Sequence, residues 1–252
     1  MPDAPAPANG PPATGSSGSA LAGGSASAID LSRTVAVALG DRAETPAGDH
    51  ARLAGLVARL TGVDAASVGL TQRCLHCGAG DHGPLRVSIA GSTAVAPRVS
   101  LARAAGRLAL AVTAAGPVGI DLESLADLER APLENVALSP AEAATLAALR
   151  PAAAALALAN IWTTKEAVLK AAGLGLRVDP RELTVGLDGA GRPDSRPLGP
   201  ADRRTVAWPQ GPFPDEDAQI WPVAAPGGTV ATVVVVCAHR PALVMVTAPP
   251  QR

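Results

Sequence analysis

Apolar residues recur along the chain with two periods, and each period predicts a different kind of element. Spacings of three and four residues predict helices over residues 49–61, over 143–158 with an interruption near Pro151, and over 160–172. Short apolar runs predict strands over residues 85–89, 108–112, 118–123, 183–187, 221–223, 229–236 and 242–246. Gly62 ends the first helix, and Ser139 with Glu142 forms a cap that starts the second helical region.

The order of these elements predicts an α+β fold in two successive halves. We divide the chain into a disordered tail over residues 1–29, an N-terminal half over residues 30–116 and a C-terminal half over residues 117–252. Gly116 and Pro117 mark the join between the halves. The tail is almost entirely Ala, Pro, Gly, Ser, Thr and Asn, so it has too little apolar surface to offset the entropy cost of ordering.

Composition and charge exclude several classes of protein. The 252 residues include 21 basic and 22 acidic side chains, and this balance disfavours a nucleic-acid binder. Three cysteines do not make a disulfide scaffold. The longest apolar run, residues 230–238, is too short to span a bilayer, and the N-terminus does not resemble a signal peptide. We therefore expect a cytoplasmic monomer that binds neither nucleic acid nor membrane.

Two short motifs contain candidate catalytic chemistry. In the strand predicted from residue 118, Asp121 and Glu123 lie on one face about 7 Å apart, so they can share a hard cation such as Mg²⁺. An ordinary strand with a polar outer face has the same alternation. In the last helix, Glu166 and Lys170 lie four residues apart on one face, as surface ion pairs do. However, 19 of the 21 basic residues are Arg, and both lysines, Lys165 and Lys170, fall in this helix.

Together the two motifs resemble the signature of the 4′-phosphopantetheinyl transferases, in particular the long two-half type that serves peptide and polyketide synthases. A Val-Gly-Ile-Asp-Leu-Glu strand at residues 118–123 is followed about forty residues later by a Trp-x-x-Lys-Glu-Ala-x-x-Lys helix at residues 162–170. The resemblance implies two similar α/β halves in a pseudo-two-fold arrangement. It also implies Mg²⁺-dependent transfer of phosphopantetheine from coenzyme A to a serine of an acyl or peptidyl carrier protein.

The resemblance implies a role for each residue of the two motifs. Asp121, Glu123 and Glu166 would bind Mg²⁺, and Glu166 would also serve as the general base for the serine hydroxyl. Lys170 would be catalytic, holding the phosphate under attack. Lys165 would either face the phosphates of coenzyme A or pair with an acidic side chain.

Other coenzyme A contacts implied by the resemblance lie in the N-terminal half. Arg86 would supply a basic group, and Ser100 lies in a segment where the family usually has Ser-His-Ser. Arg103 replaces the histidine of that segment, and an arginine can bind phosphate through two hydrogen bonds. A solvent-exposed arginine is the other interpretation of this position.

A loop with Cys74, Cys77 and His82 resembles the start of a zinc knuckle, but the further cysteine expected at residue 87 is Val87. A similar loop in bacterial members of the family lies against the adenine end of coenzyme A, so we favour this second interpretation.

Two rival functions remain at this point. A non-catalytic relative could bind carrier proteins or a nucleotide with the same fold, and the substituted histidine favours it slightly. The retention of three carboxylates together with Lys170 favours an enzyme. An unrelated Mg²⁺-dependent phosphoryl transferase is disfavoured, because the chain has no Gly-x4-Gly-Lys-Ser/Thr loop.

Overall fold

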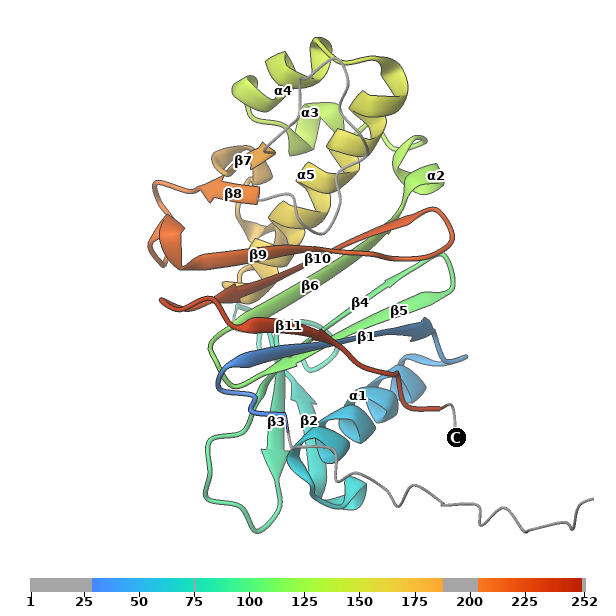
Figure 1. Ribbon diagram of the computed structural model, residues 1–252, viewed down its shortest axis with the longest axis vertical. Helices are drawn as coiled ribbons and strands as arrows, with labels where there is room; N and C mark the ends of the chain where they lie inside the picture. The colour runs from blue at the N-terminus through green and yellow to red at the C-terminus, as the bar shows by residue number, and fades with distance from the viewer. Residues whose placement is uncertain (1–28, 75, 188–203, 251–252) are drawn as a thin grey trace, which may run out of the picture.

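Two β-sheets lie next to each other at the centre of the structure (Figure 1), a computed structural model that describes residues 29–74, 76–187 and 204–250. The first sheet has the order β11-β1-β5-β4 and contains β1 (Thr34–Asp41), β4 (Arg98–Ala104), β5 (Arg107–Thr113) and β11 (Ala242–Met245). The second has the order β6-β10-β9 and contains β6 (Val118–Ser124), β9 (Ala218–Val223) and β10 (Thr229–Val236). Neighbouring strands are antiparallel, apart from the parallel pair β1 and β11.

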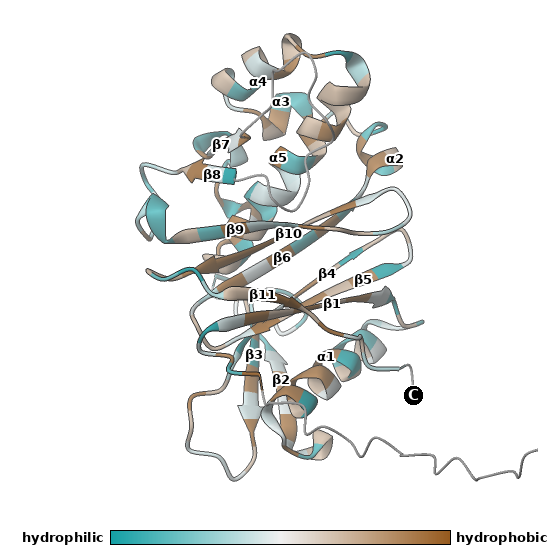
Figure 2. Ribbon diagram, viewed as in Figure 1, coloured by the Kyte–Doolittle hydropathy of each residue, from teal (hydrophilic) through white to brown (hydrophobic). Residues whose placement is uncertain are grey.

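One apolar core joins the two sheets. Its buried members include Val35 and Ala111 from the first sheet and Ile120 and Val233 from the second. A hydrogen bond links the adjacent edges, because the backbone N–H of Ile120 donates to Ser100 Oγ at 3.0 Å. Figure 2 shows hydrophobic residues along the strands of both sheets. Val, Ala, Ile and Leu side chains fill most of this core, together with the buried ring of Trp221.

The first sheet is covered by α1 (Pro46–Thr61), which presents Leu53, Leu56 and Val57 to it. The helix begins where Thr45 Oγ1 accepts a hydrogen bond from the N–H of Gly48, and it ends at Gly62, as predicted. A separate hairpin of β2 (Val68–Gln72) and β3 (Leu85–Ile89) lies beside α1 (Figure 1).

The second sheet is covered by α5 (Pro151–Ala171), which packs against β6 and β10. Shorter helices precede it: α2 (Leu125–Leu128), α3 (Glu134–Ala137) and α4 (Pro140–Ala147). The paired strands β7 (Thr184–Leu187) and β8 (Arg204–Ala207) lie near its N-terminal half (Figure 1). Short 3₁₀ turns occur at Ala65–Ser67, Gly175–Arg177, Pro180–Glu182 and Asp215–Asp217.

The predicted α+β class is confirmed, and so are the cap formed by Ser139 with Glu142 and the hairpin of β9 with β10. The predicted interruption near Pro151 is confirmed, but the predicted break between residues 158 and 160 is wrong. Pro151 starts α5, because the first turn of a helix does not need the N–H that proline lacks, and the helix then runs unbroken to Ala171.

The chain returns to the first sheet at its C-terminal end, where β11 pairs with β1. The division at residue 116 therefore does not follow the sheets over the last part of the chain. The predicted disordered tail lies outside the described residues except for residue 29. No helix in the described ranges is both long and apolar enough to cross a membrane.

Candidate active site

The strand β6 places its two acidic side chains on the face that α5 covers. Ile120 and Leu122 point into the core, as the alternation predicts. Asp121 is only 4 % exposed, although the sequence suggested a polar outer face. Covering a carboxylate in this way is unfavourable unless a cation or hydrogen-bond donors accompany it.

A glycine allows α5 to approach β6 closely enough to bring a cation to Asp121. A Cβ at Gly119 would lie 1.9 Å from the carbonyl oxygen of Ala167 and 2.7 Å from the backbone nitrogen of Ala171, so any side chain here would force the helix away. With glycine, Lys170 Nζ lies 2.6 Å from Asp121 Oδ1 and 3.3 Å from the carbonyl oxygen of Ile120. The predicted strand motif and helix motif therefore meet directly.

The three carboxylates of the two motifs influence one another electrostatically. Burial, together with the negative charge of Asp121, raises the pKa of Glu123 to about 7, and Trp162 Nε1 donates to Glu123 Oε1 at 3.1 Å. Burial and Asp121 also raise the pKa of Glu166. The carboxyl groups of Glu123 and Glu166 therefore lose their protons less readily until a further positive charge is near.

The oxygens at this site fit a hard divalent cation. Asp121 Oδ2 is buried and has no hydrogen-bond partner among the described residues, although Asp121 Oδ1 pairs with Lys170. Carboxylate oxygens are the donors that Mg²⁺ prefers. In the described ranges, the three carboxylates do not form a set whose ligand atoms all lie within 4.8 Å of one another.

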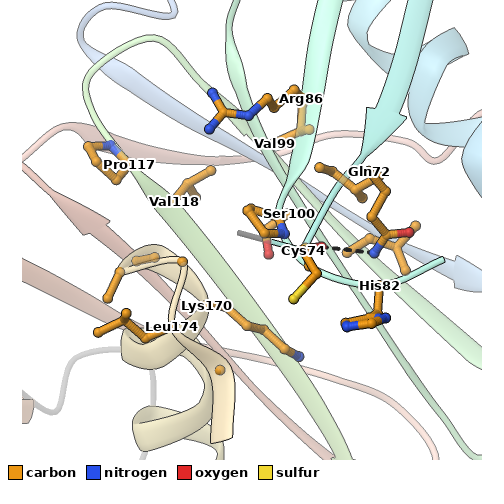
Figure 3. Close-up of a pocket in the computed structure, with 18 of the residues that line it drawn as sticks. Gln72, Cys74, His82, Arg86, Val99, Ser100, Pro117, Val118, Lys170 and Leu174 are labelled. Carbon is orange, nitrogen blue, oxygen red and sulfur yellow. Dashed lines mark hydrogen bonds between the residues drawn. The ribbon is translucent and has the colours of Figure 1, made fainter. Parts of the chain in front are cut away.

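A cleft of about 830 Å³ opens beside this cluster, and Figure 3 shows part of its lining. Its walls come from α1, the β2–β3 connection, β4, the start of β6, and the end of α5 with the turn that follows. The predicted site residues that line it are Arg86, Ser100, Arg103, Glu166 and Lys170. The structure thus brings residues of both predicted halves to one cavity.

The N-terminal residues of the cleft differ in how free they are to bind a ligand. Ser100 is buried, and its hydroxyl accepts the hydrogen bond from Ile120. Arg103 Nε donates to Asp49 Oδ2 at 2.6 Å, whereas Arg103 Nη2 is buried without a partner among the described residues. Arg86 is exposed at the rim. Arg103 is therefore held in place by Asp49 with one terminal nitrogen still available.

Sequence reasoning missed Asp49 and its neighbour His50. Asp49 is fully buried and also accepts a hydrogen bond from the backbone N–H of Ala43 at 2.7 Å. His50 lines the cleft, and burial with the positive charge of Arg103 lowers its pKa. Both lie near the start of α1. An acidic residue is common there because its charge complements the helix dipole, so nothing in the sequence singled them out.

Lys165 does not contribute to the cleft, which corrects its assignment to coenzyme A binding. Its side chain is fully buried, and Nζ donates to Glu142 Oε2 and to the carbonyl oxygen of Ala137, both at 2.6 Å. The other interpretation, a pair with an acidic side chain, is the arrangement observed. Lys165 faces the packed interior between α3, α4 and α5, one helical step away from Glu166.

Comparison with known families agrees with this geometry. A family model described as the 4′-phosphopantetheinyl transferase superfamily matches residues 117–220. No curated protein matches the chain. The region that resembles this superfamily begins just before β6 and ends within β9, so it contains Asp121, Glu123, Glu166 and Lys170 but not Ser100 or Arg103.

The raised pKa of Glu123 makes the stability of the protein depend on pH when no metal ion is bound. Between about pH 4.5 and pH 7, the folded protein keeps a proton on Glu123 that the unfolded chain has lost. Stability therefore falls as pH rises through this window, and Mg²⁺ should restore it by replacing the proton. We expect Mg²⁺ to raise the melting temperature more at about pH 8 than at about pH 5.5.

Thermal unfolding with EDTA or Mg²⁺ at the two pH values measures this difference. The control is Glu123→Gln, in which the dependence of the Mg²⁺ effect on pH should shrink. An Mg²⁺ effect that is equal at both pH values in the unmodified protein would contradict the expectation.

Proposed function

We propose that this protein transfers 4′-phosphopantetheine from coenzyme A to a serine of an acyl or peptidyl carrier protein. We further propose that it requires Mg²⁺ and acts as a cytoplasmic monomer. The observation that carries the proposal is the buried contact between Lys170 and Asp121, at the edge of a cleft that Glu166 also lines. The ammonium group of Lys170, the candidate base Glu166 and a cavity for a large substrate thus adjoin one another.

The charge of the cleft supports a polyanionic substrate. Five basic side chains line it, against the single carboxylate of Glu166; they are Arg86, Arg98, Arg103, Lys170 and Arg177. Coenzyme A carries a pyrophosphate and a further phosphate, and arginine binds such groups well. The net charge of −1 for the whole chain conceals this local excess of positive charge.

Asp121, Glu123 and Glu166 would hold the Mg²⁺ ion, since their oxygens suit a hard cation and one oxygen of Asp121 is unpaired. When bound, the ion would neutralise negative charge on the pyrophosphate and on the departing adenosine 3′,5′-bisphosphate.

In the proposed reaction, the serine oxygen forms a bond to the phosphorus that carries the pantetheine arm. The bond from that phosphorus to the bridging pyrophosphate oxygen breaks, and the leaving group is adenosine 3′,5′-bisphosphate. Glu166 accepts the proton of the serine hydroxyl, and its raised pKa makes it a stronger proton acceptor than an exposed glutamate. Lys170 holds a phosphate oxygen as negative charge develops.

The test is to incubate the full chain with coenzyme A, Mg²⁺ and an apo carrier protein, and to follow the mass of the carrier. We expect the carrier to gain one phosphopantetheine group. Glu166→Gln should lower the rate by about 10²–10⁴-fold while the protein stays folded, because a general base is lost. Arg181→Gln is a matched control, since Arg181 is exposed and pairs with Asp179 outside the cleft.

Two results would overturn parts of the proposal. If several acyl and peptidyl carriers gain no mass while coenzyme A still binds, the protein is a non-catalytic relative that binds a nucleotide. If Glu166→Gln retains full activity, Glu166 is not the base.

A further inference from the structure

The β2–β3 connection brings three soft metal ligands together at the rim of the cleft. The ligand atoms of Cys74, Cys77 and His82 all lie within 4.8 Å of one another. The closest measured approach is 3.3 Å, between Cys77 Sγ and His82 Nε2. In a tetrahedral zinc site, neighbouring ligand atoms are about 3.5–3.8 Å apart. Small side-chain adjustments are therefore enough to surround a zinc ion.

The second nitrogen of His82 has the partner that metal-binding histidines usually have. His82 Nδ1 lies 2.7 Å from Asp81 Oδ1, and Nε2 points to Cys77. An Nδ1–H that donates to a carboxylate leaves the lone pair on Nε2, which is the form of imidazole that binds a metal. The orientation of His82 is thus set for a ligand on the side of the two cysteines.

The backbone of the loop also suits a thiolate cluster. The N–H of Gly78 donates to the carbonyl oxygen of Cys74 at 3.0 Å, so the two cysteines lie on one tight turn. The N–H of Cys74 donates to the carbonyl oxygen of Ala79 at 2.8 Å, and this bond closes the turn between the cysteines.

Gly83 allows the loop to fold back onto its own start. Its φ of +97° favours glycine, and a Cβ there would lie 2.7 Å from the carbonyl oxygen of Arg73 and from Cys74 Cα. Gln72 Nε2 also donates to the carbonyl oxygen of Gly83 at 2.8 Å, and Figure 3 shows Cys74 and His82 side by side at the cavity. The loop therefore places His82 against Cys74 without distorting β2 or β3.

We propose that Cys74, Cys77 and His82 bind one zinc ion, through the two Sγ atoms and His82 Nε2. Water is the fourth ligand, on the side of the cleft that these residues line. Two thiolates and an imidazole favour zinc over Mg²⁺, so this site is distinct from the carboxylates around Asp121. The sequence had pointed to residue 87 for a further ligand, but the structure supplies the histidine from within the same loop.

A disulfide between Cys74 and Cys77 is the rival state of these residues. In the disulfide state, Asp81 would orient His82 toward no ligand. In the zinc site, the two sulfurs and His82 Nε2 bind the metal while Asp81 holds the imidazole in place. Binding of zinc displaces any remaining thiol protons and changes no oxidation state, so it needs no oxidant.

The experiment measures metal in the full chain, which is produced with zinc present and purified under reducing, anaerobic conditions. We expect one zinc ion per chain by mass spectrometry of the elements. After replacement by Co²⁺, we expect the strong visible absorption of tetrahedral cobalt and the thiolate-to-cobalt bands in the near ultraviolet. Neither measurement depends on transfer activity, so the zinc site can fail while the proposed function stands, and the reverse.

Matched variants connect the metal to these residues. Cys77→Ser should lose the zinc and the thiolate bands, whereas Cys237→Ser should keep both, because Cys237 Sγ donates to the carbonyl oxygen of His239 far from the loop. Asp81→Asn should weaken metal affinity by about 10–100-fold, as loss of a partner to a ligating histidine does.

Three results would overturn the proposal. The first is a reduced, folded chain that binds neither zinc nor cobalt. The second is zinc that survives Cys77→Ser. The third is a chain in which Cys74 and Cys77 form a disulfide, detected as a mass loss of two hydrogens, and which takes up no metal once that disulfide is reduced.

Discussion

Replacing Lys165 by methionine is expected to lower the free energy of unfolding by about 3–5 kcal/mol. Methionine has nearly the same length, so the main loss is the positive charge. Lys165 is fully buried and Glu142 is 2 % exposed, and Lys165 Nζ lies 2.6 Å from Glu142 Oε2. Without the ammonium group, the carboxylate of Glu142 stays in the interior with no opposite charge. That penalty is much larger than the net benefit of the pair itself.

The position of Glu142 makes the expected effect larger than that of an isolated pair. Its carboxylate also accepts hydrogen bonds from the backbone N–H of Ser139 at 2.7 Å and from that of Val185 at 2.6 Å. One buried ion pair therefore connects the start of α4 to α5 and β7. Burial lowers the pKa of Lys165, and the carboxylate of Glu142 opposes this shift, so Lys165 depends on Glu142 to keep its charge.

Chemical denaturation of Lys165→Met, of Glu142→Gln and of the double variant measures this coupling. The double variant should lose less stability than the sum of the two single losses, because each single change leaves the other group unpaired. Arg181→Gln is the control, since Arg181 and its partner Asp179 form an ion pair at the surface, with side chains 55 % and 40 % exposed. A loss below about 1 kcal/mol for Lys165→Met would contradict a structural role for this pair.

The contrast between the two lysines shows how far the sequence could lead. Lys165 lies four residues after Ile161 and three before Val168, and both are fully or almost fully buried. Helical spacing alone therefore puts Lys165 within the apolar stripe of α5. The scarcity of lysine in the chain drew attention to both lysines equally. Only their positions around the helix distinguish Lys165, in the buried ion pair, from Lys170, in the cleft. Its acidic partner could not be inferred, because Glu142 comes from a different helix.

Sequence patterns correctly predicted the features that are formed by residues close together in the chain. The alternation in β6, the cap at Ser139 and the hairpin of β9 with β10 each depend on residues close together in sequence, and each was predicted. Contacts between distant segments were not predicted. Arg103 is held by Asp49, 54 residues away. β11 pairs with β1 although all strands of the second sheet lie between them in the sequence. Such contacts depend on tertiary packing, which a single sequence does not specify by its periodicity.

The cluster of carboxylates and Lys170 on β6 and α5 depends both on local spacing and on contacts between distant segments. Spacing predicted that Asp121 and Glu123 share a face and that Glu166 and Lys170 share another. The sequence did not reveal that Gly119 allows these two faces to touch, because a glycine inside a strand has several possible roles. It also did not reveal that α5 buries Asp121, which leaves one of its oxygens without a partner.

Lys170→Met is expected to lower kcat for carrier modification by about 10²–10³-fold, as loss of a donor that stabilises transition-state charge does. The same change should lower the Mg²⁺ concentration needed for half-maximal activity. Lys170 Nζ lies 2.6 Å from Asp121 Oδ1, so its removal leaves the carboxylates with more negative charge to attract a cation. A lysine that only supported the fold would instead weaken both properties together.

Steady-state rates at several Mg²⁺ concentrations, with the melting temperature of each variant, separate these possibilities. Lys170→Arg is the informative companion, because it restores the positive charge without the compact ammonium group that fits between Asp121 and the carbonyl oxygen of Ile120. We expect it to recover the Mg²⁺ dependence of the unmodified protein but only part of kcat. Unchanged kcat in Lys170→Met would remove Lys170 from the reaction and leave it as the counter-ion of Asp121.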